Sequence, residues 1–249
     1  MSYVAPTIPV SYTRTRGGRV RIAPWRGDSS VAALTPLCPS DAVTPELLRA
    51  LCHDVRRLGY ESAITSALMP VEADVFVRGG FSHRETLILL RRHSWRLGHL
   101  GRGGDHDPDS TWQLRAATPS DTDAIVQLDS TAFEKNWQLD AFGLREARAA
   151  TARTHMTVVT NGDQVIGYAV TGASKRDGFI QRLAVDTEYR RQGLGRRLVI
   201  NALRWLRRNL VIDAIVNTQI DNDGALRLYQ QLGFEVQNEC LSVLGIDLR

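Results

Sequence analysis

The distribution of apolar and polar positions divides the chain into two structured regions joined by a polar segment. Residues 101–110, "GRGGDHDPDS", hold no apolar side chain and consist largely of glycine, aspartate, serine and proline. Such a composition is typical of a linker. The sequence therefore predicts one domain over residues 1–100 and a second over residues 111–249.

The second region carries apolar patterns with periods of two and of 3.6, which are typical of strands and helices. The order strand, helix, helix, three strands, helix, strand, helix, strand predicts a mixed α/β domain of about 140 residues. The Asn161-Gly162 pair marks a hairpin turn. The predicted ranges are, in chain order, 112–118, 119–133, 138–152, a hairpin over 155–170, 178–185, a helix from near Gly195, 211–218, 224–232 and 240–248.

The first region resembles part of the second. Residues 45–90 read as helix, strand, helix, Gly-Phe and strand, in the order shown by residues 196–246. Two further strands are expected at 19–24 and 30–36, pairing onto this unit. The repeat predicts a smaller α/β half domain at the N-terminus.

Aligning the two Gly-Phe pairs shows what the first copy lacks. Phe76 then stands opposite Tyr229 and Met69 opposite Asn222, so two polar positions are replaced by apolar ones. An Arg-x-x-Gly-x-Gly motif is also missing before Leu47. We expect the first unit to be non-catalytic, a scaffold that covers a sheet edge.

An arginine-rich stretch with two glycines, "YRRQGLGRR" at residues 189–197, lies between a predicted strand and a predicted helix. Free N–H groups at a helix start attract anions, and glycines let a phosphate approach the backbone closely. A solvated loop and a nucleic-acid patch are the alternatives. A dinucleotide-binding Rossmann unit fits worse, because Leu198 stands where a third glycine is needed.

Two motifs together resemble the acyl-CoA-binding core of the GNAT superfamily of N-acetyltransferases. They are "RLAVDTEYRRQGLGRRLV" and "NTQIDNDGALRLYQQLGFE", and the resemblance covers residues 112–249. It implies a mixed, mostly antiparallel sheet flanked by helices, and acetyl-CoA as cosubstrate for transfer to an amine. The whole arrangement is similar to tandem GNAT proteins such as mycothiol synthase, which concentrate catalysis in the C-terminal domain.

The resemblance also implies roles for individual residues. Main-chain groups of the strand before the loop would pair with the pantetheine arm, the loop would wrap the pyrophosphate, Asn222 would lie near the thiol, and Tyr229 would protonate the leaving thiolate. The implied cofactor-binding residues are Leu183, Ala184, Val185, Arg190, Arg191, Gln192, Gly193, Leu194, Gly195, Arg196 and Asn222.

The chemistry of acyl transfer agrees with these roles. A thioester is already activated, so the site must polarise its carbonyl, keep the amine neutral and return a proton to sulfur. A backbone N–H near Val185 can polarise the carbonyl, and a phenol (pKa about 10) is a well-matched acid for a thiolate (thiol pKa about 8.5). Asn222, Ala225 and Tyr229 share one predicted helical face.

The general base stays open at this point. Asn217 stands where ribosomal-protein N-terminal acetyltransferases carry a glutamate, which argues against a peptide N-terminus as acceptor. Four carboxylates and a water relay remain possible bases: Asp129, Glu134, Asp177 and Asp213. The aromatic residues Phe133, Trp137 and Phe142 either border an acceptor cleft or pack in the core.

Composition narrows the function classes without selecting one. The net charge is +4, and 43% of the 249 residues are apolar, which excludes a disordered tail. A CoA-binding regulatory module or a nucleic-acid-binding one is the alternative to a transferase. The three cysteines show no metal or redox spacing, and no metal site is expected. A metal at Asp105, His106, Asp107 and Asp109 is the less favoured alternative. We expect a cytoplasmic protein, since no long apolar run occurs.

Overall fold

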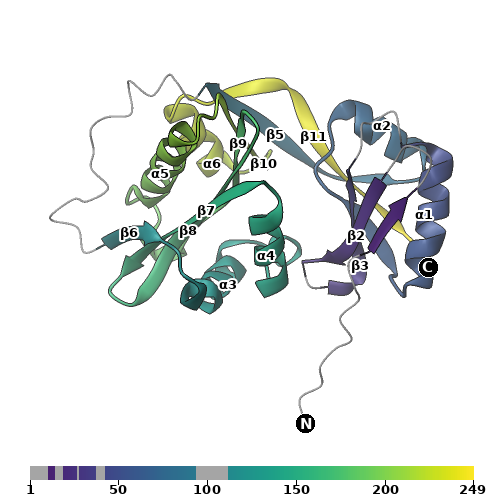
Figure 1. Cartoon of the computed structure of the whole chain (residues 1–249), viewed down its shortest axis with the longest axis horizontal. Coiled ribbons are helices and arrows are strands. Elements are labelled where there is room, and N and C mark those ends of the chain that lie inside the picture. The colour runs from purple at the N-terminus through teal and green to yellow at the C-terminus, as the bar shows by residue number, and fades with distance from the viewer. Residues whose placement is uncertain (1–10, 15–18, 27, 38–42, 94–111) are drawn as a thin grey trace, which may run out of the picture. The chain divides into compact units, whose positions relative to one another are not determined.

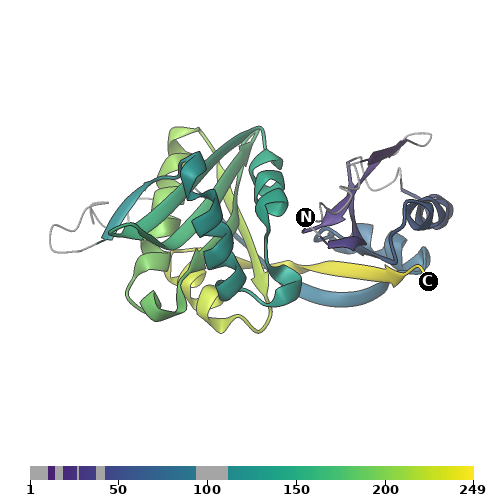
Figure 2. The same cartoon turned by 90° about the horizontal axis from the view of Figure 1, so that it is seen from below.

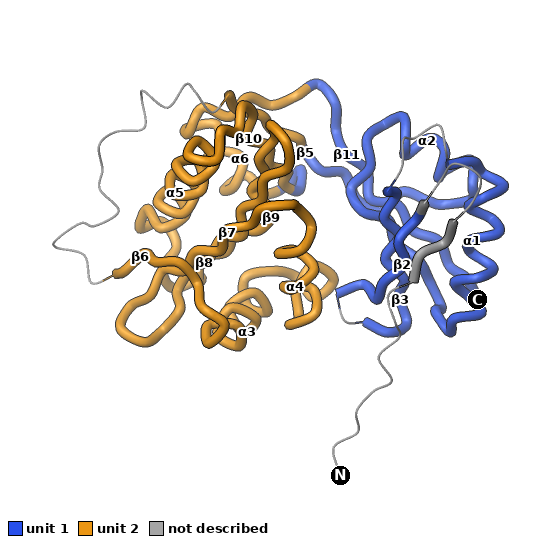
Figure 3. Tube along the Cα trace, viewed as in Figure 1, with its two compact units in different colours: residues 1–88, 219–221, 238–249 blue, residues 89–218, 222–237 orange. Residues whose placement is uncertain are grey.

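The computed structural model describes residues 11–14, 19–26, 28–37, 43–93 and 112–249. These residues form two compact units (Figure 3). Unit 1 comprises residues 1–88, 219–221 and 238–249, and unit 2 comprises residues 89–218 and 222–237. Two strands therefore contribute to both units, β5 (Ser82–His93) and β11 (Glu235–Asp247).

Unit 2 is built on a mostly antiparallel sheet with the strand order β5-β10-β9-β8-β7-β6 (Figure 1). Its own strands are β6 (Trp112–Ala116), β7 (Arg153–Asn161), β8 (Gln164–Ser174), β9 (Asp177–Val185) and β10 (Asp213–Gln219). Among these five described strands, β9 and β10 pair in parallel and the other pairs are antiparallel. The parallel pair follows from the helical crossover between its strands. The expected order of helices and strands is confirmed.

Helices cover both faces of this sheet (Figure 2). α3 (Thr122–Ala132) and α4 (Ala141–Ala149) pack on one face, where Ile125 and Leu144 meet Tyr168 and Val170. α5 (Leu194–Arg208) packs on the other, where Leu194 and Leu198 meet Ile166 and Ala169 of β8. α6 (Asp223–Gln231) follows β10.

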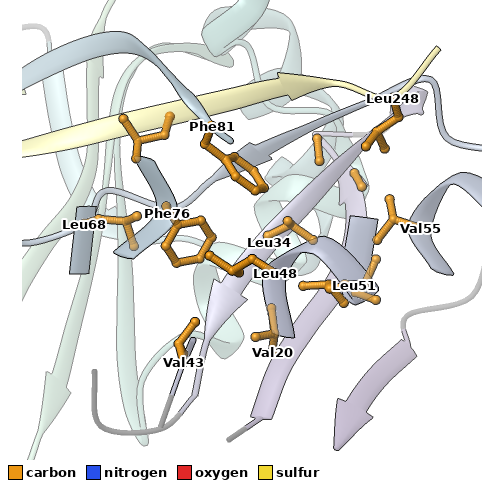
Figure 4. Packing of buried hydrophobic residues seen from close by; sticks show 14 of the residues in the cluster. Val20, Leu34, Val43, Leu48, Leu51, Val55, Leu68, Phe76, Phe81 and Leu248 are labelled. Carbon is orange, nitrogen blue, oxygen red and sulfur yellow. The ribbon is translucent and has the colours of Figure 1, made fainter. Parts of the chain in front are cut away.

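Unit 1 has the strand order β1-β2-β3-β4-β11-β5. Its elements are β1 (Ser11–Arg14), β2 (Arg19–Trp25), β3 (Asp28–Pro36), α1 (Pro45–Arg57), β4 (Ser62–Thr65) and α2 (Pro70–Arg78). One apolar core fills the space between the helices and the sheet, and Leu34, Leu48 and Phe76 lie at its centre (Figure 4). The half-domain prediction is confirmed as a helix-flanked mixed sheet.

The internal repeat extends to local geometry. Phe76 contacts Phe81 edge-to-face at 5.1 Å, and Tyr229 contacts Phe234 in the same way at 5.5 Å. In both copies the glycine before the phenylalanine has positive φ, 100° and 80°. The aligned residues Met69 and Asn222 are both N-cap residues, of α2 and α6.

The boundaries of the units differ in three places from the expected ranges: residues 89–93 group with unit 2, and residues 219–221 and 238–249 group with unit 1. Residues 238–249, expected in the second domain, group with unit 1, because β11 pairs with β4 from Gly245 to Asp247. The predicted linker 101–110, with Asp105, His106, Asp107 and Asp109, lies outside the described residues. Among the described helices, none has the length and apolarity needed to cross a membrane.

Candidate active site

The arginine-glycine stretch forms a sharp turn between β9 and α5. A 3-10 turn at Thr187–Tyr189 begins at Asp186, whose side chain accepts a hydrogen bond from the Glu188 N–H at 2.9 Å. Two left-handed residues, Arg191 at φ 64° and Gly193 at φ 84°, then bring the chain into α5. No heavy atom lies within 4 Å of where a Cβ on Gly193 would stand. The backbone is thus open to solvent at the residue that caps the helix.

This turn leaves a row of backbone donors unsatisfied. Among the described residues, the N–H groups of residues 191–196 find no acceptor, whereas Arg197 donates to the Gly193 carbonyl at 3.1 Å. Orphan donors at a helix start carry partial positive charge and suit an anion. Four of the six residues are exposed, namely Arg191, Gln192, Gly193 and Arg196.

The arginine side chains do not all turn toward this row of donors. Arg190 donates to the Val185 carbonyl at 3.3 Å and to the Ala132 carbonyl at 3.4 Å. Its guanidinium therefore joins the end of β9 to the end of α3. Gln192 donates to the Glu188 carbonyl at 3.2 Å. Arg191 and Arg196 are exposed beside the donors, and Arg190 is exposed as well.

β9 has an unpaired edge directly before this loop. Its parallel pairing with β10 runs over three pairs, from Asp213–Asp177 to Ile215–Phe179. β9 continues for six more residues, to Val185, and over these residues it pairs with β8 and not with β10. The two strands thus separate toward their carboxyl ends, and Leu183, Ala184 and Val185 lie on the free edge. An extended amide chain can add to such an edge as a further strand.

Tyr229 and Asn222 lie on α6 as the helical spacing predicts. Tyr229 is 5% exposed, and burial raises the pKa of its phenol. Asn222 is exposed and caps α6, since its Oδ1 accepts from the Ala225 N–H at 3.1 Å.

The structure separates the four carboxylates suggested as bases. Asp177 and Asp213 stand at the opposite ends of β9 and β10 from the loop, about 26 Å from Val185 for an extended strand. Asp213 also pairs with Arg91 at 3.1 Å. Asp129 is completely buried and paired, as described next. Glu134 is exposed in the connection after α3.

A buried ion pair was missed by sequence reasoning. Arg182 of β9 binds both oxygens of Asp129, at 2.7 and 2.8 Å, and Tyr168 also donates to this carboxylate. The Arg182 guanidinium stacks on Phe133, 3.4 Å from the ring centroid. The sequence suggested Asp129 as a candidate base and offered no signal for its partner.

Three aromatic residues beyond α3 are half-buried: Phe133 and Trp137 in the connection, and Phe142 in the first turn of α4. Phe133 packs against the core under Arg182, and Phe142 lies 5.6 Å from the Arg145 guanidinium. Trp137 is neither fully exposed nor fully buried. These residues therefore contact the core and are also partly exposed, so neither of the two interpretations offered by the sequence is excluded.

Residues 122–234 match the model of the acetyltransferase (GNAT) family. N-alpha-acetyltransferase 30 of Xenopus laevis is 42% identical over 59 residues, which are 24% of this chain and 22% of that protein. A mycothiol acetyltransferase of Mycolicibacterium gilvum is 27% identical over 236 residues, 84% of this chain and 77% of the relative. The chain thus spans less than a quarter of the first of these relatives.

The fold of the whole chain also has a counterpart among solved structures. A tandem GNAT protein from the clavulanic acid biosynthesis pathway superposes with a TM-score of 0.72 at 13% identity. The superposition covers 99% of this chain and 85% of that one. At this identity the likeness concerns the fold, and it supports a tandem arrangement.

Proposed function

We propose that this chain, a member of the GNAT acetyltransferase family, moves an acetyl group from acetyl-CoA to a primary amine with the chemistry confined to unit 2. The observation that carries the proposal is the free edge of β9, which ends at a turn with six unsatisfied backbone donors. A pantetheine arm carries amides that suit a strand edge, and a diphosphate suits the donors. One molecule with both parts, at this spacing, is an acyl-CoA.

The cofactor-binding residues follow from this placement. Leu183, Ala184 and Val185 offer main-chain groups to the pantetheine amides. The pyrophosphate accepts hydrogen bonds from the turn, whose residues are Arg190, Arg191, Gln192, Gly193, Leu194, Gly195 and Arg196. Of their side chains, the exposed guanidinium groups of Arg191 and Arg196 supply full charge. Asn222, exposed at the start of α6, lies on the thiol side of the cosubstrate.

The reaction is a direct displacement. The amine nitrogen forms a bond to the thioester carbonyl carbon, and the carbon–sulfur bond breaks with its electron pair going to sulfur. A backbone N–H near Val185 stabilises the carbonyl oxygen as its negative charge grows. Tyr229 donates the proton that converts the departing thiolate to CoA thiol, and the proton lost by the amine restores the phenol.

The attacking amine must be neutral, which requires a proton acceptor. Glu134 is exposed two residues beyond Ala132, whose carbonyl shares the Arg190 guanidinium with that of Val185. This places Glu134, alone among the four suggested carboxylates, in the connection next to the end of β9. Glu134 or a water held by it is the proposed base.

A panel of amines tests the function. Purified protein receives acetyl-CoA and, in turn, a peptide with a free α-amino group, the same peptide N-terminally blocked but carrying a lysine, and a small amino sugar. The α-amino peptide follows from the name of the relative N-alpha-acetyltransferase 30. CoA release that requires one of these amines supports transfer. Tight acetyl-CoA binding without amine-dependent release would instead indicate a regulatory CoA-binding module.

A further inference from the structure

The buried pair of Arg182 and Asp129 connects two parts of unit 2 that the proposed reaction needs. Arg182 comes from β9, one residue before Leu183 on the free edge. Asp129 comes from the last turns of α3. The side-chain exposures are 9% for Arg182 and 1% for Asp129, so solvent hardly screens the pair.

The partners of this pair all concern the connection between α3 and α4. Asp129 accepts a hydrogen bond from the Leu139 N–H at 2.6 Å. Arg182 donates to the Trp137 carbonyl at 2.5 Å and stacks on the Phe133 ring. Two buried charged groups thus hold the connection in place. Asp129 binds the backbone at Leu139, and Arg182 binds the backbone at Trp137 and the ring of Phe133.

The connection also has supports of its own. Gln138 donates to the carbonyls of Ser130, at 2.7 Å, and Phe133, at 3.1 Å. These bonds close the loop on itself, and the contacts with Arg182 tie it to the strand that offers the cofactor edge. The side chains of Glu134, Lys135 and Asn136 are left exposed.

We infer that Arg182 is a positioning residue that sets the acceptor side of the site against β9. The inference rests on the proposed function. It assigns the surface of residues 133–137 to the incoming amine and gives Arg182 the task of holding that surface at a fixed distance from the thioester. A buried ion pair contributes little net stability compared with an apolar pair of equal size, so geometry is the property that it supplies here.

The geometry of reaction makes this placement consequential. Displacement needs the nitrogen about 3–3.5 Å from the carbonyl carbon, and a misplacement of about 1 Å can reduce the rate about a hundredfold. Lysine at position 182 would keep a cation beside Asp129 but has one nitrogen, which cannot bind both carboxylate oxygens, the Trp137 carbonyl and the Phe133 face together.

The variant Arg182→Lys tests the inference, and Arg115→Lys is its matched control. Arg115 also binds both oxygens of a buried aspartate, Asp121, at 2.8 Å each, next to the start of the same helix. Among the described residues, the hydrogen bonds of this second pair involve residues 115–121 and none of residues 133–139. Three quantities are measured for both variants: hydrogen exchange of the amides of residues 133–139, the Kd for acetyl-CoA, and the KM for the α-amino peptide or whichever amine of the panel is acetylated.

We expect Arg182→Lys to speed exchange of the 133–139 amides at least tenfold and to raise the acceptor KM about tenfold or more. The Kd for acetyl-CoA should change less than threefold, and Arg115→Lys should match the wild type in all three. Equal effects of the two variants, or unchanged exchange and KM in Arg182→Lys, would overturn the inference. Failure of the proposed function is a different result, since there the wild type itself acetylates no amine.

Discussion

Tyr229 lies on α6 and its phenol is buried. Burial disfavours the tyrosinate, so the pKa of the phenol lies above its ordinary value of 10. The group is therefore protonated at every pH below that value. The pH dependence of turnover below about pH 9 should then report on the amine and its base rather than on this acid.

Substituting Tyr229 by phenylalanine removes the proposed acid and little else. Turnover should fall about ten- to a thousandfold while the Kd for acetyl-CoA stays within about threefold. Tyr60→Phe is the control, because Tyr60 in unit 1 is also buried. Steady-state kinetics and calorimetry decide. Equal turnover of Tyr229→Phe and wild type would remove Tyr229 from the mechanism.

Gly193 is the point at which the donor row can be blocked. A glutamate there would place a carboxylate beside the open N–H groups and would be strained at φ 84°. We expect Gly193→Glu to weaken acetyl-CoA binding at least a hundredfold. Gly59→Glu carries the same strain, at φ 94° and in open space, within unit 1. If calorimetry gives both variants the wild-type affinity, the pyrophosphate does not bind at this turn.

At the scale of elements, unit 1 has a parallel strand pair like that of unit 2, but its two strands do not separate as β9 and β10 do. The parallel pair β3–β4 keeps register from Val31–Ser62 to Leu34–Thr65, the whole length of β4. A further bond joins the Ser66 N–H to the Leu34 carbonyl at 3.0 Å. The α1 start is also closed, since the Thr44 side chain accepts from the Leu47 N–H and Pro45 has no N–H to offer.

The core of unit 1 includes an aromatic contact made by α2. Phe76 is 1% exposed and packs edge-to-face on Phe81. Phe76→Ala should lower the free energy of unfolding by about 3–5 kcal/mol, measured by urea denaturation. Because Phe76 aligns with Tyr229, the acid proposed for unit 2, the single-turnover rate of the folded variant tests its role. A rate loss similar to that of Tyr229→Phe would contradict a purely structural unit 1.

Most of the elements could be predicted because each depends on local patterns. Five apolar residues on one face predict the helix α5, and two glycines predict the turn before it. Side-chain direction could not be predicted, since it depends on partners far along the chain. Arg190 lies in the motif yet turns to Val185 and Ala132, and Arg182 finds Asp129 fifty-three positions away. The early separation of β9 and β10 is likewise a property of pairing that neither strand shows alone.

For the whole molecule, two copies of one fold raise the question of how many acyl-CoA molecules a chain binds. The sequence has no Arg-x-x-Gly-x-Gly motif before α1. In the described part of unit 1, β3 and β4 stay paired and the Thr44 side chain caps α1, unlike the free edge and open helix start of unit 2. We therefore expect calorimetric titration with acetyl-CoA to give one site per chain. In Gly193→Glu the binding heat should vanish rather than fall by half, because no second site remains to take up ligand. A stoichiometry near two, or a weak binding event that survives this substitution, would place a functional site in unit 1 and make the repeat a pair of active domains.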